Sequence, residues 1–226
     1  MSEKWSEKLD LEGKNPKVHA RTHHVLFECQ EPGVKFPWVQ IVQKDCAISA
    51  VKVLPIVIQT KVFEGASDLR ALARNTRKEN WGIILVHEKR PYPALVKDAP
   101  GTTLAELPGG LVDPTDNSLK VAALRELWEE LGIPPLQMLV GESLIETPCP
   151  ASAGAQIEGY SIYAAAFRDP SGIVLSQEEP IAKYEVIPFV DAYENLLQRH
   201  EQKEQCVDFK SLAAILMLER KLAKAF

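Results

Sequence analysis

The chain has 226 residues, of which 46% are hydrophobic, enough for one sizeable core with a small appended subdomain. Its net charge of −5 argues against a general attraction for nucleic acid. No apolar run reaches the length of a membrane span, and the charged N-terminus lacks a signal-peptide core, so we expect a cytoplasmic protein without membrane contact. The 4 cysteines are widely spaced without a C-x-x-C pair, which predicts reduced thiols.

The N-terminal part, residues 1–60, is expected to be an arm followed by β-strands. Residues 1–35 show no clear periodicity and hold His19, His23 and His24 without a carboxylate or cysteine at ligand spacing, so a loose arm is favoured over a metal site. Residues 38–43 and 47–60 are typical of strands, the second being rich in Val and Ile. The remainder, residues 61–226, is predicted to be the main domain.

In the main domain, strands alternate with helices. Strands are predicted at residues 81–88, 104–107, 138–147, 159–167 and 183–189. Helices are predicted at residues 68–78 (capped by Ser67, with its basic residues solvated), 191–202 and 208–224, and a further helix is expected between Asn117 or Ser118 and Gly132. The last two helices should bury Ala192, Tyr193, Leu196 and Leu197, and Phe209, Leu212 and Leu216. Strands on both sides of one helix, closed by further helices, indicate an α/β sandwich.

The most informative segment is R-E-L-W-E-E-L-G-I at residues 125–133, which follows the turn L-P-G-G at 107–110. On a helix, Glu126, Glu129 and Glu130 share one face because they are three and four residues apart. Like charges at this spacing repel each other, and a hard divalent cation would neutralise them at the edge of a cleft. The alternative for such a run is a solvated acidic face.

The ends and the packing of this helix can also be predicted. Its core-facing stripe is expected to be Val121, Leu124, Trp128 and Leu131. Asn117 or Ser118 can cap the start. Gly132 suits a left-handed residue after the last turn, and Pro134 with Pro135 prevents continuation. The carboxylates should therefore lie on a short and well-anchored helix.

The segment resembles the Nudix box, whose pattern is G-x5-E-x7-R-E-U-x-E-E-x-G-U, with U an aliphatic residue. The second half matches at every fixed position over residues 125–133. The first half departs from the pattern, because Asn117 stands at the Glu position and Leu111 at the Gly position. One inserted residue in the loop would restore Gly110 and Asp116 to these positions. In the family the first Glu mainly braces the loop and the Arg, so the departure concerns loop geometry more than metal binding.

The resemblance implies a Nudix α/β/α sandwich with a mixed sheet, a small N-terminal β extension, and Mg²⁺ or Mn²⁺ as cofactor. By position in the box, Glu126 and Glu130 would be the principal metal ligands, and Glu129 would join when several ions bind. Gly110 would offer its backbone carbonyl, while Arg125 would pair within the box. Oxygen-only ligands of this kind suit Mg²⁺ or Mn²⁺, and Glu130 would also count among the catalytic residues.

Beyond the box, residues 36–224 resemble the ADP-ribose and ADP-sugar pyrophosphatase branch. The segment H-E-K-R-P at 87–91 is similar to the branch's Q-x-R-x-P element, with Glu88 in place of Gln. This implies Arg90 as a diphosphate clamp, although a strand-end surface residue explains it equally well. The segment L-A-E-L-P-G-G resembles E-[FL]-P-[AG]-G and implies Glu106 as a metal-side or substrate-side carboxylate. Trp38 stands near the branch's adenine-stacking tryptophan, although simple packing is commoner for such a residue.

A catalytic base is implied in an acidic loop that follows the box in this branch. Here the loop is S-Q-E-E-P-I at residues 176–181. Glu178 and Glu179 are joint candidates, with Glu179 slightly favoured, because only one of them can point into the cleft if the segment is extended. Adjacent Glu residues in a loop are ordinarily only solvated.

The leading hypothesis is a Mg²⁺-dependent Nudix pyrophosphatase that acts on ADP-ribose or an ADP- or UDP-sugar. The products would be a nucleoside monophosphate and a sugar phosphate. One alternative is another nucleotide substrate, such as NADH, a dinucleoside polyphosphate or coenzyme A. Another is a non-catalytic module that senses a nucleotide, which the altered first half of the box suggests. The branch is commonly homodimeric, and the apolar run at 51–58 fits a dimer and a monomer core equally well.

Overall fold

The structure is a computed structural model that describes residues 24–29, 38–43, 49–59, 65–89, 103–152, 156–168, 172–175 and 180–226. For residues 24–29, 38–43, 150–152 and 156–158 only the backbone is described. None of the described helices is long and apolar enough to cross a bilayer.

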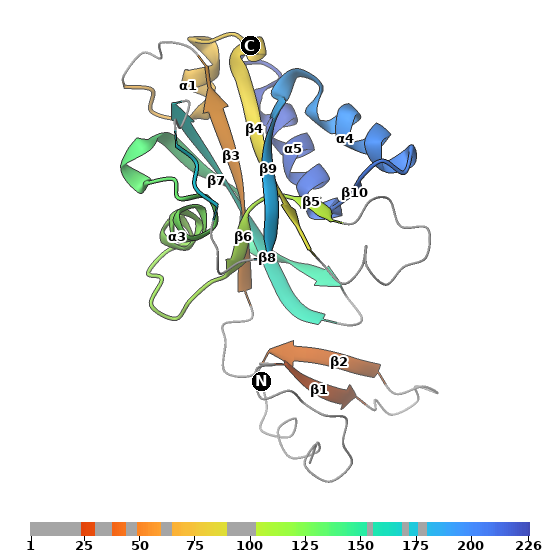
Figure 1. Ribbon diagram of the computed structural model, residues 1–226. Helices are drawn as coiled ribbons and strands as arrows, with labels where there is room; N and C mark the ends of the chain where they lie inside the picture. Colours follow the sequence, from red (N-terminus) through yellow and green to blue (C-terminus); the bar gives the residue numbers. More distant parts are fainter. Residues whose placement is uncertain are drawn as a thin grey trace.

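The ten described strands form one mixed sheet, whose first two strands lie below the main body of the molecule in Figure 1. The strands are β1 (His24–Cys29), β2 (Trp38–Gln43), β3 (Ser49–Ile58), β4 (Trp81–Glu88), β5 (Leu104–Glu106), β6 (Gly109–Leu111), β7 (Met138–Ser152), β8 (Gln156–Arg168), β9 (Ile181–Pro188) and β10 (Cys206–Val207). Their order is β1-β2-β8-β3-β4-β5-β10, and β6, β7 and β9 pair with β3, β8 and β4. The sheet is mixed because β3 runs parallel to β8 and antiparallel to β4.

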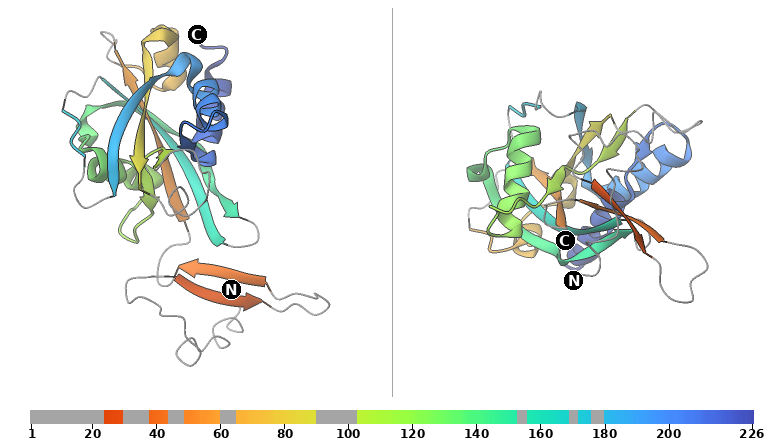
Figure 2. Two further views of the ribbon diagram at one scale, coloured as in Figure 1. Left: turned by 45° about the vertical axis from the view of Figure 1, so that its right-hand side comes forward. Right: turned by 90° about the horizontal axis from the view of Figure 1, so that it is seen from below.

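Helices cover both faces of this sheet (Figure 2). The helices are α1 (Leu69–Arg74), α3 (Leu119–Leu131), α4 (Ala192–Glu201) and α5 (Phe209–Leu222), with the 3₁₀ turns η2 (Lys78–Asn80), η3 (Pro135–Gln137) and η4 (Phe189–Asp191). One core lies between α3 and the sheet, and a second core packs α1, α4 and α5 on the other face. The α/β/α sandwich with an N-terminal β extension is therefore confirmed.

Strand β3 contributes to both cores. Every residue from Ala50 to Ile58 is buried, with Val53 and Val57 in the α3 core and Leu54 in the other. This matches the continuous apolar run, which predicts a strand covered on both faces. Although β3 belongs to residues 1–60, it lies between β8 and β4, whereas β2 joins β8 through one residue pair. The domain division at residue 60 remains a prediction.

Most predicted boundaries are close to the observed ones, but β7 extends to Ser152, five residues beyond its predicted end, and the short strands β6 and β10 were not predicted. Strand β4 begins and ends where it was predicted. The prediction of a loose arm over residues 1–35 is wrong for β1, which pairs with all six residues of β2 and so obtains its order from a partner strand. Helix α1 ends early, at Arg74, and its cap is Asp68 rather than Ser67, because Asp68 Oδ1 accepts a hydrogen bond from Ala71 N at 2.7 Å.

Two helix faces were predicted correctly only in part, since Leu131 and Leu124 of α3 and Leu212 of α5 do pack against the cores. On α3, Val121 and Trp128 are 40% and 55% exposed. Its apolar core face is Ala122, Ala123, Leu127 and Leu131. On α5, Phe209 and Leu216 are 79% and 41% exposed, and the buried residues are Ser211, Ala214, Ile215, Leu218 and Leu222. Each helix has two apolar rows, and the row with small residues packs against the sheet because it allows the closer approach.

Candidate active site

Helix α3 is held at both ends, so that its carboxylates have a fixed position. Ser118 Oγ accepts a hydrogen bond from Val121 N at 3.3 Å at the start of the helix. At its end, Gly132 adopts a φ of 63° and donates its N–H to Trp128 O at 3.0 Å. These caps satisfy backbone groups that helix termini otherwise leave unpaired. The predicted ends of this helix are confirmed.

A cavity of about 410 Å³ lies between the carboxylate face of α3 and residues 109–114, which form β6 and the start of the loop from β6 to α3. The charged residues of its wall are Glu88, Asp113, Arg125, Glu126, Glu129 and Glu130. Glycines 109 and 110 of β6 also line this acidic cavity. The wall therefore has five carboxylates and one guanidinium, which is an environment that attracts cations.

The glycine turn brings backbone atoms against the carboxylates. Gly109 has a φ of +149°, and a Cβ atom there would lie 2.1 Å from the Val51 carbonyl oxygen, so only glycine fits. At Gly110 a Cβ atom would lie 2.7 Å from Glu126 Oε1. The absence of side chains in this turn thus allows the backbone of β6 to approach Glu126 closely.

Glu130 is fixed by the same turn. Its Oε1 atom accepts a hydrogen bond from Gly109 N at 2.9 Å. Burial raises the pKa of Glu130 to about 8, against the opposing effects of this hydrogen bond and of the Lys52 charge, while the neighbouring Glu126 raises it further. Without a bound cation, this carboxyl group holds a proton at neutral pH. A strongly shifted pKa in a cavity is typical of a functional site.

Arg125 braces the cavity with one guanidinium. Its Nη1 atom donates to Glu126 Oε1 and Glu129 Oε2, both at 2.8 Å. Its Nη2 atom donates to Leu111 O at 2.8 Å and Asp116 Oδ2 at 2.9 Å. The bond to Arg125 lowers the pKa of Asp116 below its usual value. Asp116 therefore makes the bracing contact expected of the first Glu of the box, as one inserted residue in the loop predicts.

Glu106 does not line the acidic cavity. Its carboxylate forms a buried ion pair with Lys52, whose Nζ atom also donates to Leu107 O at 2.9 Å. Both side chains are about 5% exposed or less. The sequence reasoning missed Lys52, although a lysine inside the apolar run of β3 is a signal that could have identified it.

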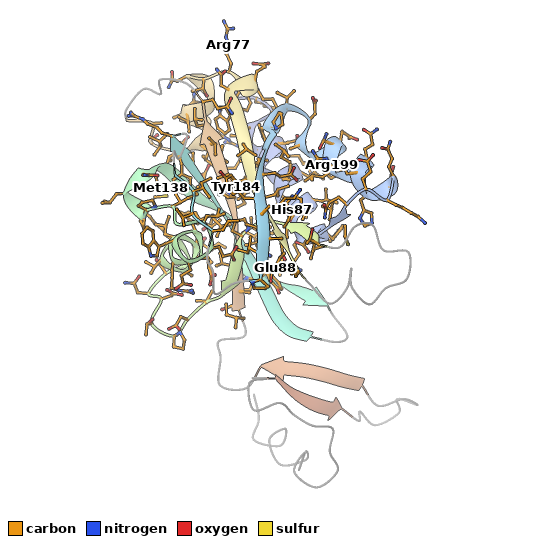
Figure 3. The ribbon with its side chains drawn as sticks, viewed as in Figure 1. Arg77, His87, Glu88, Met138, Tyr184 and Arg199 are labelled. Carbon is orange, nitrogen blue, oxygen red and sulfur yellow. The ribbon has the colours of Figure 1, made fainter. Side chains whose placement is uncertain are left out.

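The remaining candidate residues are placed only in part. Glu88, which was noted only as a replacement for Gln, lines the acidic cavity at the end of β4 and is 8% exposed (Figure 3). Arg90, Glu178 and Glu179 lie outside the described residues, as does the side chain of Trp38.

The donor set fits a hard divalent cation. It consists of the carboxylates of Glu126, Glu129 and Glu130 with the backbone of Gly110 beside them, which are oxygen ligands of the kind that Mg²⁺ and Mn²⁺ prefer. Among the described residues, no three carboxylate, imidazole or thiol groups converge at ligand spacing. Instead, Arg125 holds Glu126 and Glu129, and Gly109 holds Glu130.

Comparisons with known proteins agree with the motif. The family model described as NUDIX domain matches residues 68–208. A curated relative, "Uncharacterized Nudix hydrolase NudL" of Cronobacter sakazakii (strain ATCC BAA-894), is 39% identical over 71 residues, which cover 28% of this chain and 37% of the relative. The chain thus matches little more than a third of that relative's length. The crystal structure of a C. elegans Ap4A hydrolase binary complex is similar with a TM-score of 0.46 and 14% identity, over 78% of this chain and 98% of that one.

Proposed function

The chain belongs to the Nudix family, whose domain model spans residues 68–208, and from this premise we propose that it is a metal-dependent hydrolase of a nucleoside diphosphate-sugar. The substrate is ADP-ribose or an ADP- or UDP-sugar, and the products are a nucleoside monophosphate and a sugar phosphate. The observation that carries this proposal is the acidic cavity, in which Arg125 braces Glu126 and Glu129 while the amide of Gly109 in the glycine turn holds Glu130.

The charge of the cavity supports a metal-dependent reaction on an anion. A diphosphate would be repelled by the carboxylates of the wall, which outnumber its single guanidinium. Glu126, Glu129 and Glu130 would hold Mg²⁺ or Mn²⁺ together with the Gly110 carbonyl. Such an ion, when bound, neutralises phosphate charge and acidifies water.

The protein groups then orient the reactants. Arg125 fixes the spacing of Glu126 and Glu129, and the Gly109 amide fixes Glu130. In the reaction, water attacks one phosphorus atom and the bond from that phosphorus to the bridging oxygen breaks, so that each product leaves with one phosphate.

The remaining roles are assigned by the family resemblance. Glu179, or its neighbour Glu178, takes the proton of the attacking water, which the presence of Ile181 in the cavity wall supports. Arg90 clamps the diphosphate, two residues after the wall residue Glu88, and Trp38 stacks on the base.

Glu106 is buried against Lys52. We therefore assign it a positioning role: Lys52 links it to the Leu107 carbonyl, just before the glycine turn.

The brace at Asp116 supports the enzyme over the alternative of a non-catalytic nucleotide sensor. The first half of the box is altered in sequence, yet Arg125 is braced by Asp116 and by the Leu111 carbonyl. A loop that keeps this brace keeps the carboxylates in place for catalysis.

A hydrolysis screen with Mg²⁺ tests the proposal. The substrates would be ADP-ribose, ADP-glucose, UDP-glucose, NADH, diadenosine polyphosphates and coenzyme A, with products separated chromatographically. AMP and ribose 5-phosphate should form from ADP-ribose with wild type and with Glu204→Gln, a matched change at an exposed residue, but not with Glu130→Gln. If the protein hydrolysed only NADH, dinucleoside polyphosphates or coenzyme A, the proposed substrate class of nucleoside diphosphate-sugars would be wrong. Binding of ADP-ribose without any turnover would make the protein a sensor.

We further propose that the protein is a homodimer, as the branch resemblance implies. Sedimentation velocity at micromolar concentration should give the mass of two chains. A monomer under these conditions would contradict this part of the proposal.

A further inference from the structure

A second cavity, of about 490 Å³, lies between α1 and the C-terminal end of α5. Its charged wall residues are all cationic: Arg70 and Arg74 of α1, and Arg220, Lys221 and Lys224 at the end of α5. Two alanines complete the described wall, to which no acidic residue contributes. We call it the basic cavity, and nothing in the proposed function uses it.

Two segments far apart in the sequence build this cavity. Figure 1 shows α1 beside the C-terminus of the chain. Arg70 Nε donates to the Lys221 carbonyl oxygen at 3.2 Å, which fastens α1 to the last turn of α5. Arg70 and Arg74 are four residues apart and so share one helix face. Arg77 projects away from the molecule instead (Figure 3), and Lys78 lies over the Phe189 ring at 5.2 Å.

The cationic charge exceeds what the surrounding protein compensates. The C-terminus of a helix carries roughly half a negative charge, which cations in the last turn offset. Lys221 pairs with Glu142 at 2.9 Å, and Arg74 helps to lower the pKa of Asp68. Within the described part of the chain, the side chains of Arg220 and Lys224 have no hydrogen-bond or ion-pair partner. An excess of positive charge therefore remains around one concavity of a chain with net charge −5.

We propose that the basic cavity binds an anion with at least two phosphate groups. Guanidinium groups bind phosphate oxygens in pairs, and the wall provides three of them. The volume lies within the range of about 300–1,000 Å³ that is usual for small-molecule sites. The described wall has no aromatic ring on which a base could stack, so the phosphate chain is the part recognised.

The basic cavity is separate from the acidic one. Phe226, which follows the wall residue Ala225, packs against Trp81 at the first residue of β4, with ring centroids 5.1 Å apart. Glu88 lines the acidic cavity at the last residue of β4. The length of that strand, roughly 23 Å at the usual rise per residue, separates the two sites.

Calorimetric titration of the full chain with inorganic tripolyphosphate, in EDTA and low salt, tests this proposal. Wild type should bind, and added salt should weaken the affinity because the wall is open to solvent. Arg74→Ala/Lys224→Ala should reduce the affinity about tenfold or more, which corresponds to the loss of charge-assisted hydrogen bonds. Arg77→Ala, which removes one positive charge close to α1 but outside the cavity, should bind within about twofold of wild type.

Several results would overturn the proposal. These are no binding by wild type, an equal loss in Arg77→Ala, or a single-stranded oligonucleotide bound more tightly than tripolyphosphate. Unchanged binding in Arg74→Ala/Lys224→Ala would place the anion outside the basic cavity and would also overturn the proposal. Because the titration involves no hydrolysis, its failure is distinct from failure of the proposed function. Thermal unfolding would confirm that the double variant folds, and Arg74→Gln/Arg220→Gln repeats the test with bulkier side chains.

Discussion

The two cavities of this molecule have opposite charge, and they differ in how that charge is held. In the acidic cavity, Arg125 makes five hydrogen bonds, and the Gly109 amide holds Glu130. In the basic cavity, a bond from Arg70 and an ion pair of Lys221 are the described contacts that hold its cations in place. Charges fixed by neighbouring groups suit a reaction that needs exact geometry. Charged side chains that are exposed to solvent suit the binding of an anion, because they can reach it without breaking contacts with the protein.

The largest difference should appear when a lysine is removed beside each cavity. Lys52→Met removes the lysine of the buried ion pair with Glu106 and should lower the free energy of unfolding by about 3–5 kcal/mol. Lys224→Met, at the exposed wall of the basic cavity, should change it by less than about 0.5 kcal/mol. Urea unfolding measures both values.

Equal stability of the two lysine variants would contradict the proposed difference between the two cavities in how their charges are held. A second variant identifies the cause, because Lys52→Met/Glu106→Leu removes both charges of the buried pair. It should recover most of the lost stability, since an apolar pair of similar volume does not need the ion pair. A double variant as unstable as Lys52→Met would assign the loss to packing.

The glycine turn of the acidic cavity gives the next largest effect. Gly109→Ala adds a Cβ atom 2.1 Å from the Val51 carbonyl oxygen at a φ of +149°, and should lower the free energy of unfolding by about 3 kcal/mol. Gly65→Ala is the matched control, because Gly65 has a φ of +104° with nothing within 4 Å of the added atom, so that backbone strain of about 1 kcal/mol remains. Equal losses in thermal or urea unfolding would show that the β3–β6 contact is not rigid.

An Arg→Lys substitution should have different effects on turnover in the two cavities, because Arg125 is held by several hydrogen bonds and Arg220, within the described part of the chain, is not. Arg125→Lys keeps the charge but cannot reach Glu126, Glu129, Leu111 and Asp116 at once, so turnover should fall about 10–100-fold. Arg220→Lys, in the basic cavity, should leave turnover unchanged. Steady-state kinetics with the substrate identified in the screen measures both. Full turnover in Arg125→Lys would show that the brace is not needed.

Local signals in the sequence predicted the elements and the acidic helix well. The caps of α3 depend on Ser118 and Gly132, and both act within a few residues of themselves. The box carboxylates share a face because helix geometry requires it. Asp116 could be placed at the brace because counting along one loop was sufficient.

Features that depend on packing between distant segments could not be predicted. Hydrophobic periodicity identifies an apolar row on a helix, but it does not show which of two such rows faces the sheet. On α3 the row that contains the alanines faces the sheet, and Val121 and Trp128 are exposed. Lys52 and Glu106 are 54 residues apart, and Arg70 and Lys221 are 151 apart. No local pattern joins such pairs, so neither the buried ion pair nor the basic cavity was visible in the sequence.

The smallest expected effect is a pH-dependent change in stability, and it concerns the carboxylate of Glu185, which is paired with Arg199 of α4. The pKa of Glu185 is lowered to about 2 by the hydrogen bond from His87 and, with a smaller effect, by Arg199, whose Nη1 atom lies 3.0 Å from each carboxylate oxygen. Because the pKa in the folded protein is below the ordinary 4.5, the stabilisation is full above pH 4.5 and is lost as the pH falls towards 2.

Arg199→Met should therefore lower the free energy of unfolding at pH 7 by about 0.5–1 kcal/mol and have a smaller effect at pH 2, where about half of the Glu185 carboxyl groups are protonated in wild type. Arg220→Met removes the same charge from the basic cavity and should change the stability by less than about 0.5 kcal/mol at either pH. Urea unfolding at the two pH values distinguishes the cases. If Arg199→Met lost as much stability at pH 2 as at pH 7, Arg199 would stabilise α4 through packing of its side chain. In that case, the ion pair with Glu185 would not be what makes Arg199 differ from Arg220 of the basic cavity.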